Sequence, residues 1–278
     1  MKTRIVVDST ADILPEYLDQ IHTVPLTVSF GEEEYIDGVT IDHRTFYQKL
    51  IETDAMPSTS QASPAAFAEQ YDQAADDEEV VVITISSKLS GTYQSAMIAA
   101  AGCSSVYVVD SENASVGCGI LVGLALRYLR DGMTASAIAE KLQEDKKKIV
   151  VIALLDTLEY LKRGGRISKA AAFAGGLLNI KPVISIADGE IQLLGKARGS
   201  KMGNNLLAQQ IQKVGGIGFT KPVLLGYTGL SDVRLQKYIE DSSYLWSASL
   251  DAVRYVSIGS VIGAHAGPGA IAVAFFRK

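Results

Sequence analysis

Val80-Val81-Val82-Ile83-Thr84-Ile85 runs directly into Ser86-Ser87-Lys88-Leu89-Ser90-Gly91-Thr92, and this stretch decides the fold class. Its first part is short, apolar and β-branched, which predicts a strand buried on both faces, as in a parallel sheet. From Thr92 onward the apolar side chains share one helical face, so a helix is predicted there. A hydroxyl-rich loop therefore joins the carboxyl end of a buried strand to a helix start. Open α/β sheets bind their ligands at this position.

Two interpretations of the loop hydroxyls compete. Ser87 or Ser90 can cap the following helix, which explains most serines in such places. Alternatively, the free backbone N–H groups and the positive end of the helix favour an anionic ligand. A second hydroxyl-rich loop is predicted around Ser58-Thr59-Ser60, before a helix that Ser63 caps and Pro64 begins, so capping leaves these hydroxyls unexplained. Two such segments in one α/β domain can converge on one anionic group.

The rest of the chain predicts two α/β domains. In the first half, apolar strands at 5–8, 80–85 and 106–110 alternate with amphipathic helices, which favours a three-layer α/β/α domain with a largely parallel sheet. In the second half, two apolar runs flank Asp188-Gly189, a strong hairpin signal. We therefore expect an N-terminal domain over residues 1–155 and a C-terminal α/β domain with antiparallel hairpins over 156–278.

Composition excludes several classes of protein. The 278 residues are 47% hydrophobic and 21% charged with a net charge of −5, which fits a globular protein and argues against a general nucleic-acid binder. Cys103 and Cys118 are the only cysteines and neither adjoins a histidine, so neither a disulfide framework nor a Cys-rich zinc site is expected. Cytoplasmic localisation is predicted, since the first residues begin a strand and lack a signal-peptide core. Residues 255–276 carry no formal charge, but His265, Pro268 and several glycines predict two strands around a tight loop rather than a membrane span.

No cofactor or metal is predicted. The first strand is followed by Asp8-Ser9-Thr10-Ala11-Asp12 rather than a glycine-rich phosphate loop, and no Walker A motif is present, so nucleotide binding is not expected. A serine esterase that uses Ser90, His265 and Asp8 remains an alternative, although Ser90 lacks the G-x-S-x-G context. His265 is expected in a glycine-flanked turn, where backbone bonding is the simpler role.

Arg166 is a candidate contact for a partner. A helix is predicted to stop at Gly164-Gly165, and Arg166 follows it, where its side chain can project freely. A guanidinium in that position suits an acidic surface or a phosphate.

Several of these segments together resemble the DegV family of bacterial fatty-acid-binding proteins, the FakB-type subunits of fatty acid kinase. The matching motifs are Asp8-Ser9-Thr10, Tyr35-Ile36-Asp37-Gly38, Thr59-Ser60-Gln61, Leu89-Ser90-Gly91-Thr92, Leu158-Glu159-Tyr160-Leu161-Lys162-Arg163-Gly164-Gly165-Arg166 and the glycine-flanked His265. Their order and spacing cover nearly the whole chain. One departure is Ala62, where the family often has proline.

The resemblance implies a protein of phospholipid metabolism that is not itself an enzyme. It implies that a long-chain fatty acid lies in a tunnel between the two domains. The N-terminal domain would hold the carboxylate through Thr59, Ser90 and His265, and the C-terminal domain would close the acyl tunnel. A separate ATP-dependent kinase subunit, docked near Arg166, would convert the carboxylate to an acyl-phosphate. Neither nucleic acid nor an integral membrane segment is implied.

Overall fold

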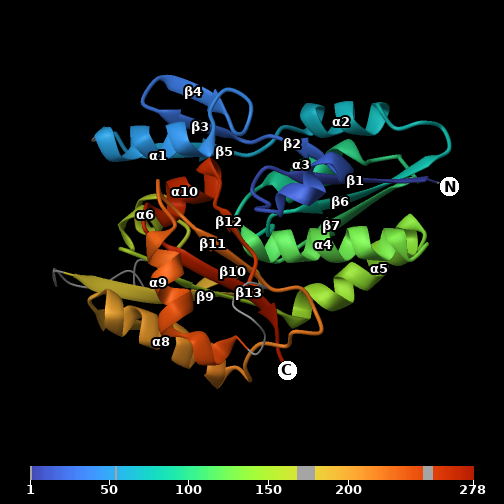
Figure 1. Ribbon diagram of the computed structural model, residues 1–278. Helices are drawn as coiled ribbons and strands as arrows, with labels where there is room; N and C mark the ends of the chain where they lie inside the picture. Colours follow the sequence, from blue (N-terminus) through green and yellow to red (C-terminus); the bar gives the residue numbers. More distant parts are fainter. Residues whose placement is uncertain (1, 54, 168–178, 247–252) are drawn as a thin grey trace.

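The computed structural model describes residues 2–53, 55–167, 179–246 and 253–278, and its elements are arranged in three sheets (Figure 1). A four-stranded sheet has the order β2-β1-β6-β7 and every pairing in it is parallel. Its strands are β1 (Lys2–Asp8), β2 (His22–Val24), β6 (Glu78–Thr84) and β7 (Val106–Asp110). The predicted strands at 5–8, 80–85 and 106–110 are therefore confirmed.

Helices cover both faces of the parallel sheet, which confirms the three-layer prediction. The helices are α2 (Pro64–Asp72), α3 (Thr92–Ala99), α4 (Val116–Arg130) and α5 (Ala135–Asp145). Alternate residues of β6 point to opposite faces. Val80 and Val82 lie on the face of the sheet that α2 and α3 cover. Val81 and Ile83 lie on the opposite face, which α4 and α5 cover. Ser63 caps α2, as predicted, by accepting a hydrogen bond from Ala66 N.

A small antiparallel sheet with the order β4-β3-β5 adjoins this domain. Its elements and the helix beside it are β3 (Thr27–Phe30), β4 (Glu33–Ile36), β5 (Pro57–Ser60) and α1 (His43–Glu52). The prediction that Ser58-Thr59-Ser60 forms a loop is wrong, because this segment is β5. Its backbone is paired with β3, in which Val28 lies opposite Thr59. Such long-range pairing leaves no local periodic signal.

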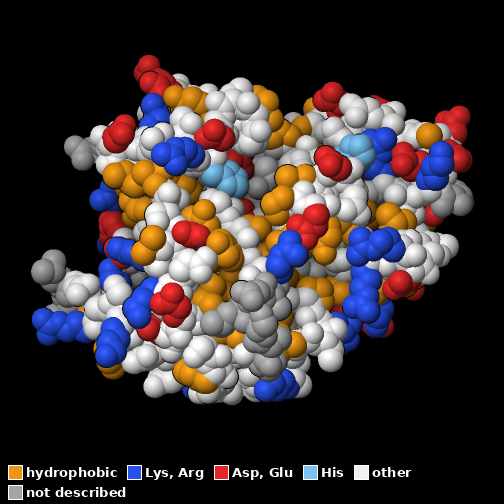
Figure 2. Space-filling model, in the orientation of Figure 1, with side chains coloured by type: hydrophobic (Ala, Val, Ile, Leu, Met, Phe, Trp, Pro, Cys, Tyr) orange, Lys and Arg blue, Asp and Glu red, His pale blue; other side chains and the backbone are white. Residues whose placement is uncertain are grey.

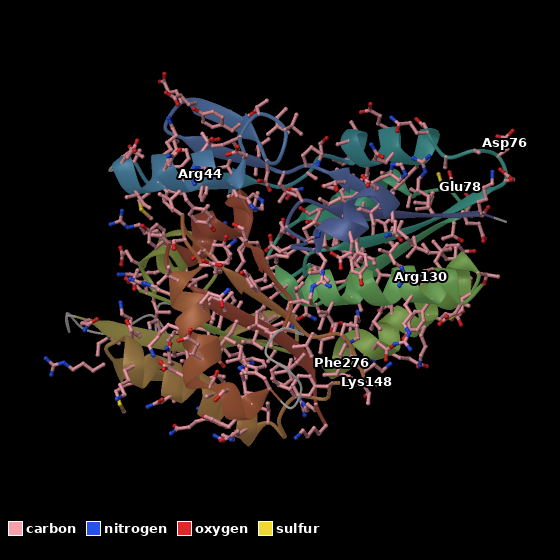
Figure 3. All side chains as sticks on the ribbon, in the orientation of Figure 1. Arg44, Asp76, Glu78, Arg130, Lys148 and Phe276 are labelled. Atoms are coloured by element: carbon pink, nitrogen blue, oxygen red, sulfur yellow. The ribbon has the colours of Figure 1, made fainter. Side chains whose placement is uncertain are left out.

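The C-terminal half builds a six-stranded sheet with the order β10-β9-β8-β13-β11-β12. All its pairings are antiparallel except β11 with β12. The strands are β8 (Ile149–Leu154), β9 (Ile180–Ala187), β10 (Glu190–Arg198), β11 (Leu224–Tyr227), β12 (Tyr255–Ser257) and β13 (Ile271–Phe276). The hairpin at Asp188-Gly189 is confirmed, and both turn residues have positive φ, 51° and 79°. Figure 3 shows Phe276, at the end of β13, beside Lys148, which directly precedes β8.

The two faces of the six-stranded sheet have different partners. One face packs against α8 (Ser200–Lys213) and α9 (Val233–Asp241) through an apolar cluster of its own. On the other face lies α4, which contacts strands of both large sheets. The boundary between residues 155 and 156 stays a prediction, and β8, which belongs to the second sheet, precedes it.

Residues 255–276 are not two strands around a tight loop, so that prediction is wrong. A helix, α10 (Ser260–Ala266), lies between β12 and β13 and carries His265 in its last turn. Its apolar residues pack against both halves of the chain, and Gly267, with a φ of 71°, ends it. Figure 1 shows α10 between α1 and the six-stranded sheet, and it contacts β3 and β5 as well.

Short helices complete the described chain, and no described helix is long and apolar enough to cross a membrane. They are α6 (Glu159–Arg163), η1 (Pro15–Gln20), η2 (Lys146–Lys148) and η3 (Ser243–Leu245). On the face shown in Figure 2, side chains of both charge signs are scattered among apolar ones.

The packing of α4 gives a matched pair of glycine substitutions. A Cβ atom at Gly119 would lie 2.0 Å from the backbone O of Asp12, whereas one at Gly123 would lie 3.3 Å from the Tyr17 ring. Gly119→Ala should therefore lower the free energy of unfolding by about 1–3 kcal/mol, because the backbone must move. Gly123→Ala should be neutral or stabilise by up to about 1 kcal/mol through its better helix propensity. Urea denaturation of both variants checks this, and equal stabilities would contradict the close approach of α4 to Asp12.

Candidate functional site

An apolar cavity of ≈ 400 Å³ lies between α10, the loops of the parallel sheet and the six-stranded sheet. Its floor comes from the sheet, where Ala153 lies opposite both Ala272 and Ile184 in neighbouring strands. In the next row Val151 lies opposite Ile186. These side chains share one face because the alternation along each strand matches the register between strands. The volume is in the range of pockets that hold small organic ligands.

Polar side chains enter the cavity wall from several separate segments, and Ser115 and Ser185 are among them. Thr59 and the neighbouring Ser60 and Gln61 come from β5 and the residue after it, Ser90 from the loop before α3, Arg166 from the turn after α6, and His265 from α10. The three predicted binding residues, Thr59, Ser90 and His265, therefore line one cavity. Among the described lining residues, Arg166 is the only Lys, Arg, Asp or Glu.

Thr59 and His265 contact each other directly. The Thr59 hydroxyl lies 2.9 Å from His265 Nε2, and the bond joins β5 to the last turn of α10. Burial lowers the pKa of His265 to about 4, and the positive charge of Arg166 adds to this effect. The imidazole is therefore neutral at pH 7. A Cβ atom at Gly164 would lie 2.2 Å from His265 Nδ1, so glycine at this position lets the turn after α6 approach the ring.

Ser90 contacts the start of α3 and also lies in the cavity wall. Its hydroxyl accepts a hydrogen bond from Thr92 N at 3.3 Å, at the start of α3, and lies 2.9 Å from the Thr92 hydroxyl. It also faces the cavity. A Cβ atom at Gly91 would lie 2.0 Å from Gln61 Oε1, so the loop packs tightly against the residue that follows β5. The two hydroxyl-rich segments are therefore neighbours in the structure.

Arg166 does not project freely, so that part of the prediction is wrong. Its guanidinium donates hydrogen bonds to Leu89 O at 3.2 Å and to Gly164 O at 2.5 Å. The side chain is half-buried and lies in the cavity wall. The bond to Leu89 O holds the side chain against the Ser90 loop, and only folding brings these two residues together.

The arrangement does not form the relay that a serine esterase needs. The hydroxyl of Ser90 is bonded to Thr92, and the Nε2 atom of His265 to Thr59. Among the described residues, His265 Nδ1 has no hydrogen-bond partner, so no carboxylate orients the ring. Asp8 bonds instead to Thr10 and to Ile85 N.

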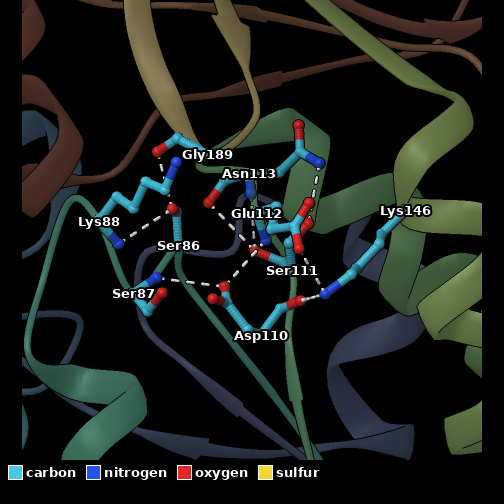
Figure 4. Close-up of polar contacts among 9 residues, drawn as sticks. All are labelled: Ser86, Ser87, Lys88, Asp110, Ser111, Glu112, Asn113, Lys146 and Gly189. Atoms are coloured by element: carbon cyan, nitrogen blue, oxygen red, sulfur yellow. Dashed lines mark hydrogen bonds and ion pairs between the residues drawn. The ribbon is translucent and has the colours of Figure 1, made fainter.

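The hairpin turn docks on the loop that carries Ser90. The buried Ser86 hydroxyl donates a 2.7 Å hydrogen bond to Gly189 O, and Figure 4 shows the polar network around it. In this network Ser87 N donates to Asp110 Oδ1, and Lys146 Nζ lies 2.9 Å from Glu112 Oε1. The turn of the C-terminal sheet thereby holds the loop after β6 in place.

Sequence reasoning missed the residues that support the cavity from behind. Asp12, Ser115 and Gln61 all take part in the contacts around it, and Ser115 and Gln61 line it. Asp12 stood out only as part of the polar run after the first strand, and Gln61 only as part of the Thr59-Ser60-Gln61 motif. No group of three or more His, Cys, Asp or Glu side chains in the described chain is placed to hold a metal ion.

The fold and the site together define an α/β protein with an apolar cavity and a cluster of polar side chains in its wall. The family model described as "Uncharacterised protein, DegV family" matches residues 2–278. A DegV domain-containing protein of Caldanaerobacter subterraneus is 35% identical over 100% of this chain and 99% of its own length. The chain belongs to the DegV family, as its motifs predicted.

Solved structures of DegV proteins share this fold. A DegV protein from Thermus thermophilus, described by its fatty acid binding, is 33% identical with a TM-score of 0.86, over 99% of this chain and 100% of its own. A stearic-acid-binding protein from Eubacterium ventriosum is 31% identical with a TM-score of 0.86, over 100% of this chain and 99% of its own. The predicted α/β fold with a parallel sheet and antiparallel hairpins is confirmed.

The lowered pKa of His265 predicts a pH dependence of stability. A histidine whose pKa falls on folding contributes stability above its unfolded value of about 6.5, and this stability is lost as the pH falls toward 4. The free energy of unfolding should therefore decrease more steeply from pH 7 to pH 4 in the unsubstituted protein than in His265→Gln. His22, whose pKa burial also lowers, is present in both proteins. Urea titrations at fixed pH measure both slopes, and identical slopes would contradict a buried neutral His265.

Proposed function

We propose that this protein binds a long-chain fatty acid and holds its carboxylate at Thr59, Ser90 and His265. The observation that carries the proposal is an apolar cavity whose wall contains hydroxyls, a neutral imidazole and a single guanidinium. The hydroxyls and the imidazole can donate hydrogen bonds to a carboxylate, and the aliphatic floor suits an acyl chain. The fatty acids named for the related structures from Thermus thermophilus and Eubacterium ventriosum support the same ligand class.

Simple energetics support this ligand class. Burial of an acyl chain contributes roughly 0.8 kcal/mol per methylene group, on the order of 10 kcal/mol for a long chain. Lost freedom on binding costs at least several kcal/mol. The buried carboxylate needs hydrogen bonds, because an unpaired buried charge is strongly unfavourable. Hydroxyl and imidazole donors supply such bonds.

We also propose that the bound fatty acid is the substrate of a separate ATP-dependent kinase subunit. The kinase would phosphorylate the carboxylate to an acyl-phosphate, and Arg166 would contribute to its docking. The sequence has neither a Walker A motif nor a glycine-rich dinucleotide loop, which fits such a division of labour. The protein would act in the cytoplasm in phospholipid metabolism, with a fatty acid as its only ligand and without a cofactor.

The head-group assignment predicts a loss of affinity in two hydroxyl variants. Ser90→Ala and Thr59→Ala each remove a hydrogen bond to a charged group, which should weaken fatty-acid binding by roughly 1.5–3 kcal/mol, about ten- to a hundredfold. Their effects should be non-additive, because both hydroxyls bind one carboxylate. Native mass spectrometry of the purified protein should show a co-purified fatty acid, and the double variant should lose it. Fluorescence competition would give the affinities.

Ser87→Ala is the matched control for these variants. Ser87 belongs to the same loop but is exposed, and the bond that holds it comes from its backbone N–H. The control should bind fatty acid as the unsubstituted protein does. Unchanged affinity in the double variant would refute the head-group assignment, and labelling of Ser90 by a fluorophosphonate would favour an esterase.

If Arg166 contributes to docking of the kinase subunit, its substitution should lower acyl-phosphate formation without lowering fatty-acid affinity. Arg166→Gln keeps an N–H donor for Leu89 O but removes the charge, so fatty-acid affinity should change little. Acyl-phosphate formation with the kinase subunit should fall about fivefold, equivalent to ~1 kcal/mol, and should depend less on salt. Arg163→Gln is the control, since Arg163 is exposed on the neighbouring α6 and pairs with Glu159. Equal turnover in both variants would leave Arg166 as a residue of the cavity wall alone.

A further inference from the structure

We propose that Asp12 is a positioning residue for acyl-chain binding, because its carboxyl group joins two separate walls of the cavity. The inference rests on the proposed function, since it concerns how the fatty-acid site is held together. Asp12 itself does not line the cavity. It lies behind the wall, in the loop after β1, and is 5% exposed.

Each carboxyl oxygen of Asp12 has its own partner. Oδ2 accepts a 2.6 Å hydrogen bond from the hydroxyl of Ser115, and Oδ1 accepts a 2.7 Å bond from the backbone N–H of Gly259. Ser115 belongs to the N-terminal half and Gly259 to the C-terminal half. One side chain thus connects parts of the chain that are far apart in sequence, inside the protein, where hydrogen bonds are strong and costly to leave unmade.

Ser115 is held in a conformation that needs outside support. It lines the cavity directly before α4, and its backbone has φ 56° and ψ −132°, which non-glycine residues rarely adopt. Its N–H donates to Thr10 O at 3.1 Å, and its hydroxyl donates to Asp12. The loop after β1 therefore holds both the backbone N–H and the hydroxyl of Ser115.

The other wall is α10. Ile258, next to Gly259, lines the cavity, and its carbonyl accepts a 2.9 Å hydrogen bond from the Tyr47 hydroxyl. Within α10, Val261, Ile262 and His265 also line it. Asp12 holds the start of this helix at Gly259 and Thr59 holds its last turn at His265, about 9 Å further along at 1.5 Å per residue. The bond to Asp12 thus fixes the direction in which α10 presents its lining residues.

The charge state of Asp12 makes this role measurable. Burial raises its pKa to about 7, and the negative charge of Asp37 adds to the rise. The other titratable groups around it are Tyr47, Cys118 and His43, whose Nε2 lies beside Gly259. An acyl chain that displaces solvent from Ser115 and Ile258 would remove further water from the vicinity of Asp12 and raise its pKa again. Binding near pH 7 should then be accompanied by uptake of a fraction of a proton.

The first test compares Asp12→Asn and Asp12→Ala in their affinity for a long-chain fatty acid. Asn keeps an acceptor for Gly259 N and can donate to Ser115, so affinity should stay within about threefold. Ala removes both bonds and should weaken binding about tenfold or more. Asp145→Asn is the control for stability. It alters a buried carboxylate that binds Tyr128 and Lys148 away from the cavity, and affinity should be retained.

The second test measures the proton. Calorimetric titration at pH 7 in two buffers of different ionisation enthalpy gives the number of protons taken up, which is about half a proton at most for one group with a pKa of about 7. Uptake should fall in Asp12→Asn, whereas any uptake by His265 is common to both proteins. Full affinity in Asp12→Ala, or unchanged uptake in Asp12→Asn, would overturn the role of Asp12. Absence of fatty-acid binding by the unsubstituted protein would instead overturn the proposed function.

Discussion

The site depends on the placement of α10 between the two halves of the chain. This helix belongs to the C-terminal half, yet the groups that hold it come from the N-terminal half. Thr59 bonds to His265 at its end, Asp12 to Gly259 at its start, and Tyr47 to the carbonyl of Ile258. With seven residues, α10 gains little stability from its own hydrogen bonds, so packing and these contacts must keep it folded. The cavity lies between α10 and the six-stranded sheet, in space that the side chains of the helix do not fill.

Local patterns predicted the elements whose burial is simple. The run 80–85 forms a central strand that helices cover on both faces. A strand buried on both faces has a continuous apolar sequence, so the pattern predicted it. The hairpin at Asp188-Gly189 was equally clear, because its turn needs positive φ at both residues. Both β5 and α10 escaped prediction. In β5 the polar residues belong to a three-stranded sheet, and in α10 the glycines act as helix ends and close contacts rather than as turn residues.

The sequence predicted which residues meet at one cavity but not how the structure brings them together. Thr59, Ser90 and His265 line one cavity, as expected from the hydroxyl-rich segments and the glycine-flanked histidine. Arg166 lies in the same cavity wall, which its place after a double glycine did not indicate, because the carbonyl of Leu89, distant in sequence, accepts one of its hydrogen bonds. Asp12 gave no signal of its own. Its partners Ser115 and Gly259 lie 103 and 247 residues away in the sequence, and sequence periodicity carries no information about such pairs.

The chemistry of the wall suits a carboxylate that must still react in the proposed complex. An ion pair with a buried cation would lower the nucleophilicity of the carboxylate, whereas hydroxyl groups and a neutral imidazole bind it without cancelling its charge. The lowered pKa of His265 keeps that ring neutral, and the nearby guanidinium of Arg166 contributes to the lowering. Arg166 is itself engaged with two carbonyl oxygens, so its donors are partly occupied before any ligand arrives. A carboxylate held in this way would be desolvated and oriented, and it would remain charged for transfer of a phosphoryl group by the kinase subunit.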